Sequence, residues 1–258
     1  MLLDGRNAVI YGGGGAIGGA GARVFALEGA KVHLAGRTLE PLERVAGQVR
    51  AAGGVAEVAV VDALDEAAVD AHADQVAAAA GSIDTCMNVI SHGDVQGTPL
   101  VEMSLADFER PVHAAVRTMF ITARAVARHM IRQRSGVILT FGGAGGRDPL
   151  RHVFSGGYQI HLGGTQVAFG AMDVLRRQLA CELGPHGIRV VTLESAGVPE
   201  TLGDEWREAM TPALVDGTML KRAVTLEDVG NAAVFAASDR ARAITATALN
   251  ITAGREAD

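Results

Sequence analysis

The sequence predicts an α/β protein with a doubly wound parallel sheet, helices on both faces and a single domain over residues 1–258. Short apolar runs alternate with longer helical stretches almost to the end of the chain. Several runs are apolar on both faces, as in residues 136–141, which suits a parallel sheet covered by helices on each side. Strands are expected near residues 7–11, 31–35, 55–61, 84–90, 136–141, 188–193 and 247–251, and helices near 17–29, 39–52, 65–80, 104–133, 165–184 and 226–237.

The first strand runs into a glycine cluster and then into a helix. Gly13, Gly15 and Gly18 fit the spacing G-x-G-x-x-G, and the second strand follows at the distance of a βαβ unit. Glycines permit positive φ angles and let a pyrophosphate approach the main chain, while the following helix offers free N–H groups and the positive end of its dipole. The predicted ligand is a dinucleotide, although a glycine-rich turn by itself also occurs as a simple loop.

The loops after the later strands are expected to carry the other functional residues, because ligands of doubly wound sheets lie outside the carboxyl ends of the strands. Two of these loops are long, at about residues 142–164 and 198–221. Such loops are usually lids or substrate walls, and a disordered insert is the alternative. Apolar side chains in the second loop favour a bulky apolar ligand, although such a lid can also simply cover the cofactor: Leu202, Trp206, Met210, Leu214 and Met219.

Composition argues against several classes of function. The net charge is −6 and the pI is about 5.8, so the chain offers no basic field for nucleic acid. No apolar run reaches the roughly 18 residues that a membrane span requires, and residues 1–6 do not resemble a secretory signal, so we expect a cytoplasmic location. Cys86 and Cys181 form neither a metal-ligand pair nor a disulfide framework, and we expect no metal site.

Several motifs together resemble the short-chain dehydrogenase/reductase family over essentially the whole chain. The family motif T-G-x-x-x-G-x-G falls on residues 11–18, with Ala16 in place of the middle glycine, and residues 84–91 sit where the family reads D-x-x-x-N-N-A-G. The resemblance implies a Rossmann fold, a nicotinamide dinucleotide, a small-molecule substrate and a homo-oligomer, either dimer or tetramer. The cofactor contacts implied by the motifs are Gly12, Gly13, Gly14, Gly15, Ile17, Gly18, Arg37, Thr38, Asp62, Ala63, Asn88, Ile90 and Ser91.

The end of the second strand favours NADP(H). NAD-dependent relatives usually carry an acid there, which binds the ribose 2′-OH and would repel a 2′-phosphate. Here the position is Gly36, followed by Arg37 and Thr38. A guanidinium can pair with a phosphate through two hydrogen bonds, so charge and resemblance both favour NADP(H). A solvated surface arginine is the alternative.

The resemblance fails at the family's catalytic residues. Relatives use Asn, Ser, Tyr and Lys, and the corresponding positions here are Ala115, Gly143, Thr165 and Phe169. The only lysines in the sequence are Lys31 and Lys221, and neither lies in the segment where relatives build the active site. The usual pair of Tyr and Lys therefore cannot operate in this chain.

Two other side chains are the leading catalytic candidates. Residues 156–162 and 163–169 are near copies, and seven residues are close to two helical turns, so Tyr158 is expected on the face that carries the catalytic Tyr in relatives. Tyr158 can donate a proton, and His161 can act as acid, base or orienter near neutral pH. The alternative is that Tyr158 caps a substrate pocket while His161 is packed or solvated. His92, near the predicted nicotinamide edge, makes either a substrate or catalytic contact or a structural one.

Three functions fit these observations. The first is an NADP(H)-dependent oxidoreductase with a non-standard active site, acting on a small or medium apolar carbonyl, imine or enone. The second is a catalytically inactive nucleotide-binding or partner subunit, as the loss of the catalytic residues would suggest. The third is a non-redox isomerase or dehydratase on the same fold, because function depends on the site rather than on the fold.

Overall fold

The computed structural model describes residues 1–143 and 161–256. Its centre is a seven-stranded sheet of order β3-β2-β1-β4-β5-β6-β7 in which every neighbouring pair is parallel. The order reverses between β1 and β4, which is where doubly wound sheets bind ligands. The strands are β1 (Asn7–Tyr11), β2 (Lys31–Gly36), β3 (Val55–Val60), β4 (Thr85–Asn88), β5 (Gly136–Gly143), β6 (Ile188–Ser195) and β7 (Thr247–Asn250).

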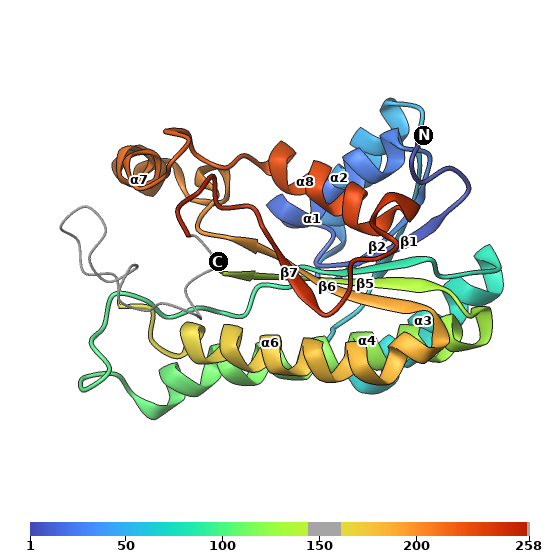
Figure 1. Ribbon diagram of the computed structural model, residues 1–258, viewed down its shortest axis with the longest axis horizontal. Helices are drawn as coiled ribbons and strands as arrows, with labels where there is room; N and C mark the ends of the chain where they lie inside the picture. The colour runs from blue at the N-terminus through green and yellow to red at the C-terminus, as the bar shows by residue number, and fades with distance from the viewer. Residues whose placement is uncertain (144–160, 257–258) are drawn as a thin grey trace.

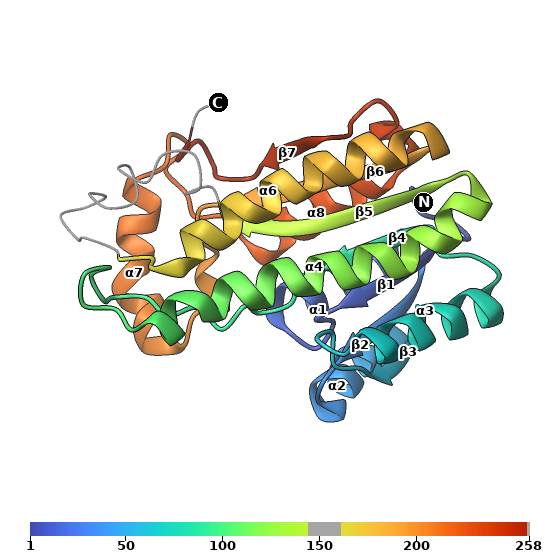
Figure 2. The same ribbon diagram turned by 90° about the horizontal axis from the view of Figure 1, so that it is seen from below.

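Helices cover both faces of this sheet, which confirms the predicted fold class (Figure 1). One face is covered by α1 (Ala16–Leu27), α2 (Leu39–Ala51) and α8 (Leu226–Ala237). The other face is covered by α3 (Glu66–Ala80), α4 (Leu105–Gln133) and α6 (Gly164–Leu183). Figure 2 shows α4 and α6 lying side by side along this second face.

Apolar side chains form a large buried cluster on each side of the sheet. The first includes Phe25, Leu34 and Leu193, and the second includes Val9 and Ile138. Successive side chains of a strand point to opposite faces of the sheet and so pack into the two clusters in turn. The strands are therefore apolar on both faces. None of the helices in the described part of the chain is long and apolar enough to cross a membrane.

One predicted loop contains a helix. The segment 198–221 holds α7 (Asp204–Asp216), which lies at the left of Figure 1, beyond the end of the sheet. The expectation of a loop was wrong for these residues. The sequence did not indicate the helix because α7 contains Pro212 and buries no residue, so its apolar side chains follow no clear helical period. In the other long loop, Gly142 and Gly143 belong to β5 and Gly164 to α6, while residues 144–160 lie outside the described residues.

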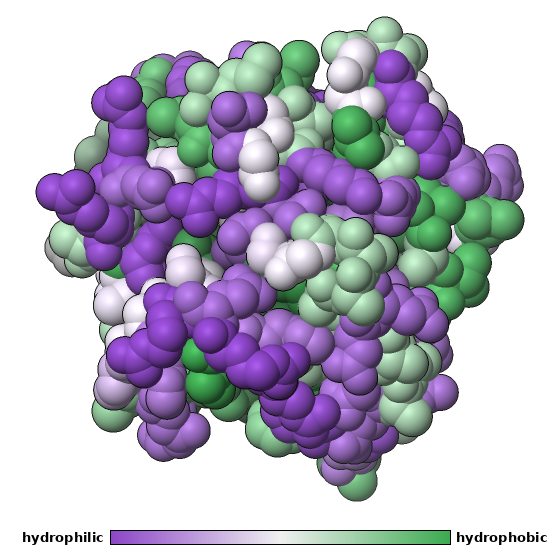
Figure 3. Space-filling model, turned by 90° about the vertical axis from the view of Figure 1, so that its right-hand side faces the viewer, coloured by the Kyte–Doolittle hydropathy of each residue, from purple (hydrophilic) through white to green (hydrophobic). Residues whose placement is uncertain are grey.

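The two ends of the sheet differ in surface character. Figure 3 shows the side that lies at the right of Figure 1, where the strands begin, and hydrophilic residues cover most of it, with apolar residues in separate groups between them. The carboxyl ends of the strands lie at the opposite end, beside α7. That end carries every residue implicated in cofactor binding by the sequence.

Candidate cofactor and substrate site

The glycine turn after β1 is packed so closely that side chains are excluded. Gly12 has a φ of +87°, and a Cβ there would lie 2.5 Å from the carbonyl oxygen of Val89. Its N–H donates to the carbonyl of Ala35 at 2.9 Å. A Cβ at Gly18 would overlap the carbonyl oxygen of Gly12 and lie 2.9 Å from its carbonyl carbon. The turn therefore brings bare main chain to the surface at the start of α1.

The N-terminus of α1 is open to an anion. Its N-cap is Gly15, which has no side chain to cap the free N–H groups, and no acidic residue lies in its first turn. Helices α3, α4 and α8 differ, because the side chains of Asp65, Ser104 and Thr225 accept hydrogen bonds from their first turns. Gly15 and Ala16 are exposed. The uncapped N–H groups and the helix dipole fit a pyrophosphate.

Arg37, the basic residue predicted to bind the 2′-phosphate on the ribose, is exposed beside this turn. Arg37 and Thr38 follow β2 directly, and both are exposed. Arg37 has no hydrogen bond or ion pair with any residue that the structure describes. A second guanidinium approaches from α2, where Nη2 of Arg44 donates to the carbonyl oxygen of Gly14 at 3.4 Å. No carboxylate among the described residues pairs with either arginine.

The other predicted cofactor residues lie after β3 and β4, at the same edge. Asp62 is exposed and its carboxylate accepts the N–H of Leu64 at 3.0 Å. Asn88 is buried, donates from Nδ2 to Oγ1 of Thr122 at 2.9 Å and accepts the N–H of Ile90 at 3.3 Å. Because β1 to β4 are parallel, their carboxyl ends bring these loops together as the sequence predicts. Of the remaining predicted contacts, Gly13, Ala63 and Ser91 lie in these loops and Ile17 lies in the first turn of α1.

Apolar packing surrounds the positions that align in sequence with the family's catalytic residues. A Cβ at Gly143 would overlap Cε2 of Phe169 and lie 3.0 Å from Cδ2. Ala115 is fully buried in a cluster with Met119 and Met172. Thr165 is 1% exposed, and its hydroxyl is buried without a hydrogen-bond partner among the described residues. The Phe169 ring thus takes the place that a serine side chain at Gly143 would need.

His92 packs against this apolar group. It lies in the loop after β4, is 9% exposed, and its ring meets that of Phe169 edge to face with 6.3 Å between the centroids. Burial lowers the pKa of His92, and the nearby carboxylate of Asp94 works in the opposite direction. The imidazole is therefore neutral at pH 7. The sequence placed His92 near this edge but gave no sign of its contact with Phe169.

Of the two leading catalytic candidates, Tyr158 and His161, the structure describes only His161. Tyr158 lies outside the described residues. His161 is described, and it precedes α6 instead of lying on a helical face, because that helix begins at Gly164 after Gly163 with φ 54° and ψ −136°. The carbonyl of His161 accepts the N–H of Gly97 at 2.8 Å, which ties it to the loop after β4. His161 therefore lies beside the loop that follows β4.

Neither lysine lies among the residues assembled at this edge. Lys31 begins β2, at the amino end of the sheet, and its Nζ lies 2.6 Å from a carboxylate oxygen of Glu57. Lys221 follows α7 and donates from Nζ to the carbonyl of Asp216 at 2.7 Å. Among the residues that the structure describes, no group of three or more His, Cys, Asp or Glu side chains could hold a metal.

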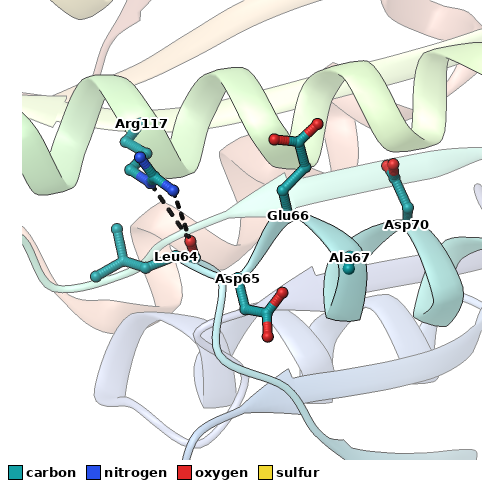
Figure 4. A pocket seen from close by; sticks show the side chains of 6 residues that line it. All are labelled: Leu64, Asp65, Glu66, Ala67, Asp70 and Arg117. Atoms are coloured by element: carbon teal, nitrogen blue, oxygen red, sulfur yellow. Dashed lines mark hydrogen bonds between the residues drawn. The ribbon is translucent and has the colours of Figure 1, made fainter.

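An open hollow of about 580 Å³ lies beside the site, where the start of α3 meets α4 (Figure 4). Nε and Nη2 of Arg117 both donate to the carbonyl of Leu64 at 3.3 Å across it. Carboxylates of Asp65, Glu66 and Asp70 also line it. None of the residues aligned with the family's catalytic positions lines this hollow.

The packing of Phe169 on Gly143 gives a testable coupling. We expect Gly143→Ser to lower the free energy of unfolding by about 1–3 kcal/mol, because the new side chain must displace the ring. In a Phe169→Ala background the same substitution should cost far less, giving a non-additive double-mutant cycle in urea unfolding. Gly142→Ser is the matched control, since its Cβ would meet only Cγ2 of Thr192, at 3.2 Å. Additive effects in the cycle would contradict the packing.

Comparisons with known proteins agree with this fold. A family model described as enoyl-(acyl carrier protein) reductase matches residues 14–256. The D-threitol dehydrogenase of Mycolicibacterium smegmatis is 30% identical over 98% of this chain and 93% of its own length. The galactitol 2-dehydrogenase of Rhizobium johnstonii is 30% identical over 98% of this chain and 95% of its own length.

Solved structures match over the whole chain as well. The crystal structure of levodione reductase has a TM-score of 0.86 and 25% identity, covering 98% of both chains. A short-chain dehydrogenase/reductase from Serratia marcescens has a TM-score of 0.83 and 25% identity, covering 100% of both chains. The likeness therefore includes the sheet, its helices and the edge at which the glycine turn lies.

Proposed function

Because the chain belongs to the short-chain dehydrogenase/reductase family, whose members bind a nicotinamide dinucleotide, we propose that it is an NADP(H)-dependent oxidoreductase with a non-standard active site. The observation that supports this most directly is the open α1 N-terminus with Arg37 beside it, which pairs with no residue in the described part of the chain. The residues fit the cofactor, since a Cβ at Gly12 or Gly18 would collide with main-chain atoms, so the close turn beside the free N–H groups of α1 requires glycine at both positions. When bound, the nicotinamide supplies or accepts the hydride.

The preference for NADP(H) rests on charge. Gly36 places no carboxylate at the end of β2, so nothing there would repel a 2′-phosphate. Arg37 is available for a bidentate pair, and Arg44 adds a second positive charge on the same side of the glycine turn.

We expect Arg37→Ala to weaken NADPH binding by about 10-fold or more and to leave NADH binding nearly unchanged, because only NADPH carries the 2′-phosphate. Titrations of both cofactors, followed by nicotinamide fluorescence, measure the two dissociation constants. Arg177→Ala is the matched control, since Arg177 is exposed on α6 and pairs with Asp173 at 2.6 Å. Equal losses for both cofactors, or none, would show Arg37 to be a solvated surface residue.

We propose a small or medium apolar carbonyl, imine or enone as the substrate. Phe169 makes the catalytic region apolar, and α7 beyond the sheet presents Trp206, which is 66% exposed. A cationic iminium needs less help from an acid at the reacting heteroatom than a ketone does. The names of the relatives, which include polyol dehydrogenases, support oxidation and reduction at a C–O bond as the starting class.

The function is tested by mixing the protein with NADPH and panels of ketones, imines and enones while absorbance at the nicotinamide band is followed. Consumption of NADPH with one class supports the oxidoreductase. Binding of NADPH without consumption across all panels would favour a nucleotide-binding partner subunit, which the apolar packing at Ala115, Gly143, Thr165 and Phe169 would also suit.

A homo-oligomer is proposed as well, either a dimer or a tetramer. The outer sides of α4 and α6 leave apolar side chains exposed, with Phe120 at 46%, Val167 at 48% and Val174 at 67%. Exposed apolar side chains on adjacent helices are typical of an interface. Light scattering during gel filtration measures the mass directly. The cytoplasmic location stays a prediction.

A further inference from the structure

One titratable side chain is buried among the residues that replace the family's catalytic groups. His92 meets the Phe169 ring edge to face, and that ring in turn fills the space beside Gly143. These three residues come from the loop after β4, from α6 and from the end of β5. They therefore meet at the carboxyl edge of the sheet, next to the segment Asn88 to Ser91 that is implicated in cofactor binding.

The other positions at this point offer little acid or base. Ala115, Gly143 and Phe169 carry no ionisable group, and the hydroxyl of Thr165 is a weak acid. His92, whose ring meets that of Phe169, carries a side chain that titrates near neutral pH. Its ring forms no hydrogen bond with any described residue.

We propose that His92 is the catalytic acid and base of this site and contacts the reacting oxygen of the substrate, a role that rests on the oxidoreductase function proposed above. In alcohol oxidation, the neutral imidazole takes the hydroxyl proton and becomes imidazolium, while the C–H bond gives its hydride to NADP⁺ and the C=O bond forms. In reduction, the imidazolium returns that proton to the oxygen of the carbonyl that receives the hydride. Atoms and charge balance in both directions.

The charges around His92 set the direction of its pH dependence. Burial lowers the pKa of His92, Asp94 in the same loop opposes this, and Arg110 of α4 lies close to Gly93 but pairs with Asp107 at 2.8 Å. The neutral base therefore dominates above pH 6.5. Alcohol oxidation should lose activity as the pH falls below 6.5, because protonation removes the proton acceptor.

Kinetics of His92→Gln test the proposal. We expect kcat for oxidation to fall about 10²- to 10⁴-fold, the acidic limb of the pH profile to disappear, and added imidazole to restore part of the rate. His186→Gln is the matched control, since His186 lies before β6 at the opposite end of the sheet. Near-ultraviolet circular dichroism checks that both variants fold. A His92→Gln enzyme within about threefold of the native kcat, with its acidic limb intact, would overturn the proposal.

A second measurement does not depend on turnover. The imidazole resonances of the eight histidines can be followed by NMR, with His92 assigned by its loss in His92→Gln. We expect NADP⁺ to shift the His92 resonance and 2′-phospho-ADP-ribose, which lacks the nicotinamide, to leave it in place. If the His92 resonance shifts equally with both ligands, or with neither, His92 does not lie at the nicotinamide. If the native protein transfers no hydride, the proposed function fails, and the NMR result still decides whether His92 lies at the nicotinamide.

Discussion

Gly18→Ala should abolish useful dinucleotide binding, with the dissociation constant for NADPH rising on the order of 100-fold or more. The added methyl group would overlap the carbonyl oxygen of Gly12 and lie 3.0 Å from Cα of Gly13, so it meets main chain on two sides. Gly12 is held in place, because its N–H donates to the carbonyl of Ala35 at 2.9 Å. The turn must therefore open, which moves the N–H groups that would hold the pyrophosphate. Fluorescence titration with NADPH measures the loss.

The unfolding free energy should also fall, by about 2–4 kcal/mol, since backbone atoms must be displaced to fit the methyl group. Gly47→Ala provides the matched control. Gly47 lies in α2 with nothing within 4 Å of its Cβ position, so the same chemical change there should raise helix stability by about 0.5–1 kcal/mol and leave NADPH binding unaltered. Native affinity in Gly18→Ala would mean that the turn does not hold the cofactor.

The fold could be predicted from the sequence because its strands are apolar on both faces and its helices are bounded by clear signals. Asp65, Ser104 and Thr225 accept first-turn hydrogen bonds at the starts of α3, α4 and α8, close to the predicted starts. Helix α7 lacked such a cap, since Gly203 precedes it. The acidic pair Asp204 and Glu205 was the available sign of its first turn.

The candidate site was predictable only where it depends on local sequence. The glycine turn and Arg37 each lie directly after one strand, so their place at the ligand edge follows from the sheet. The contact of His92 with Phe169 joins segments that are far apart in the chain, and no local pattern reveals it. The same holds for Tyr11, which the sequence placed at the start of the glycine motif.

Tyr11 turns out to be one half of a buried polar pair in the core beneath the turn. Its hydroxyl lies 3.1 Å from Nδ1 of His72 on α3, and both residues are buried. Burial lowers the pKa of His72 from 6.5 to about 4, with a smaller contribution from nearby His33. Burial also raises the pKa of Tyr11, so its hydroxyl stays protonated and can donate to the neutral imidazole.

From this pair we expect the protein to lose stability as the pH falls from 6.5 to about 4. Over that range the unfolded chain binds a proton at His72 while the folded chain does not, so acid favours unfolding. The pKa difference corresponds to about 3 kcal/mol once the pH is below 4, and His33, whose pKa burial also lowers, adds to the same loss. Urea unfolding at a series of pH values measures this.

His72→Gln separates this effect from general acid denaturation. Its amide oxygen can still accept from the Tyr11 hydroxyl but gains no proton, so the unfolding free energy of the variant should fall less steeply than that of the native protein between pH 6.5 and 4. His113→Gln, on an exposed position of α4, should follow the native curve. If the unfolding free energy of His72→Gln also falls in parallel with that of the native protein, the acid sensitivity comes from other groups and not from the buried pair of Tyr11 and His72.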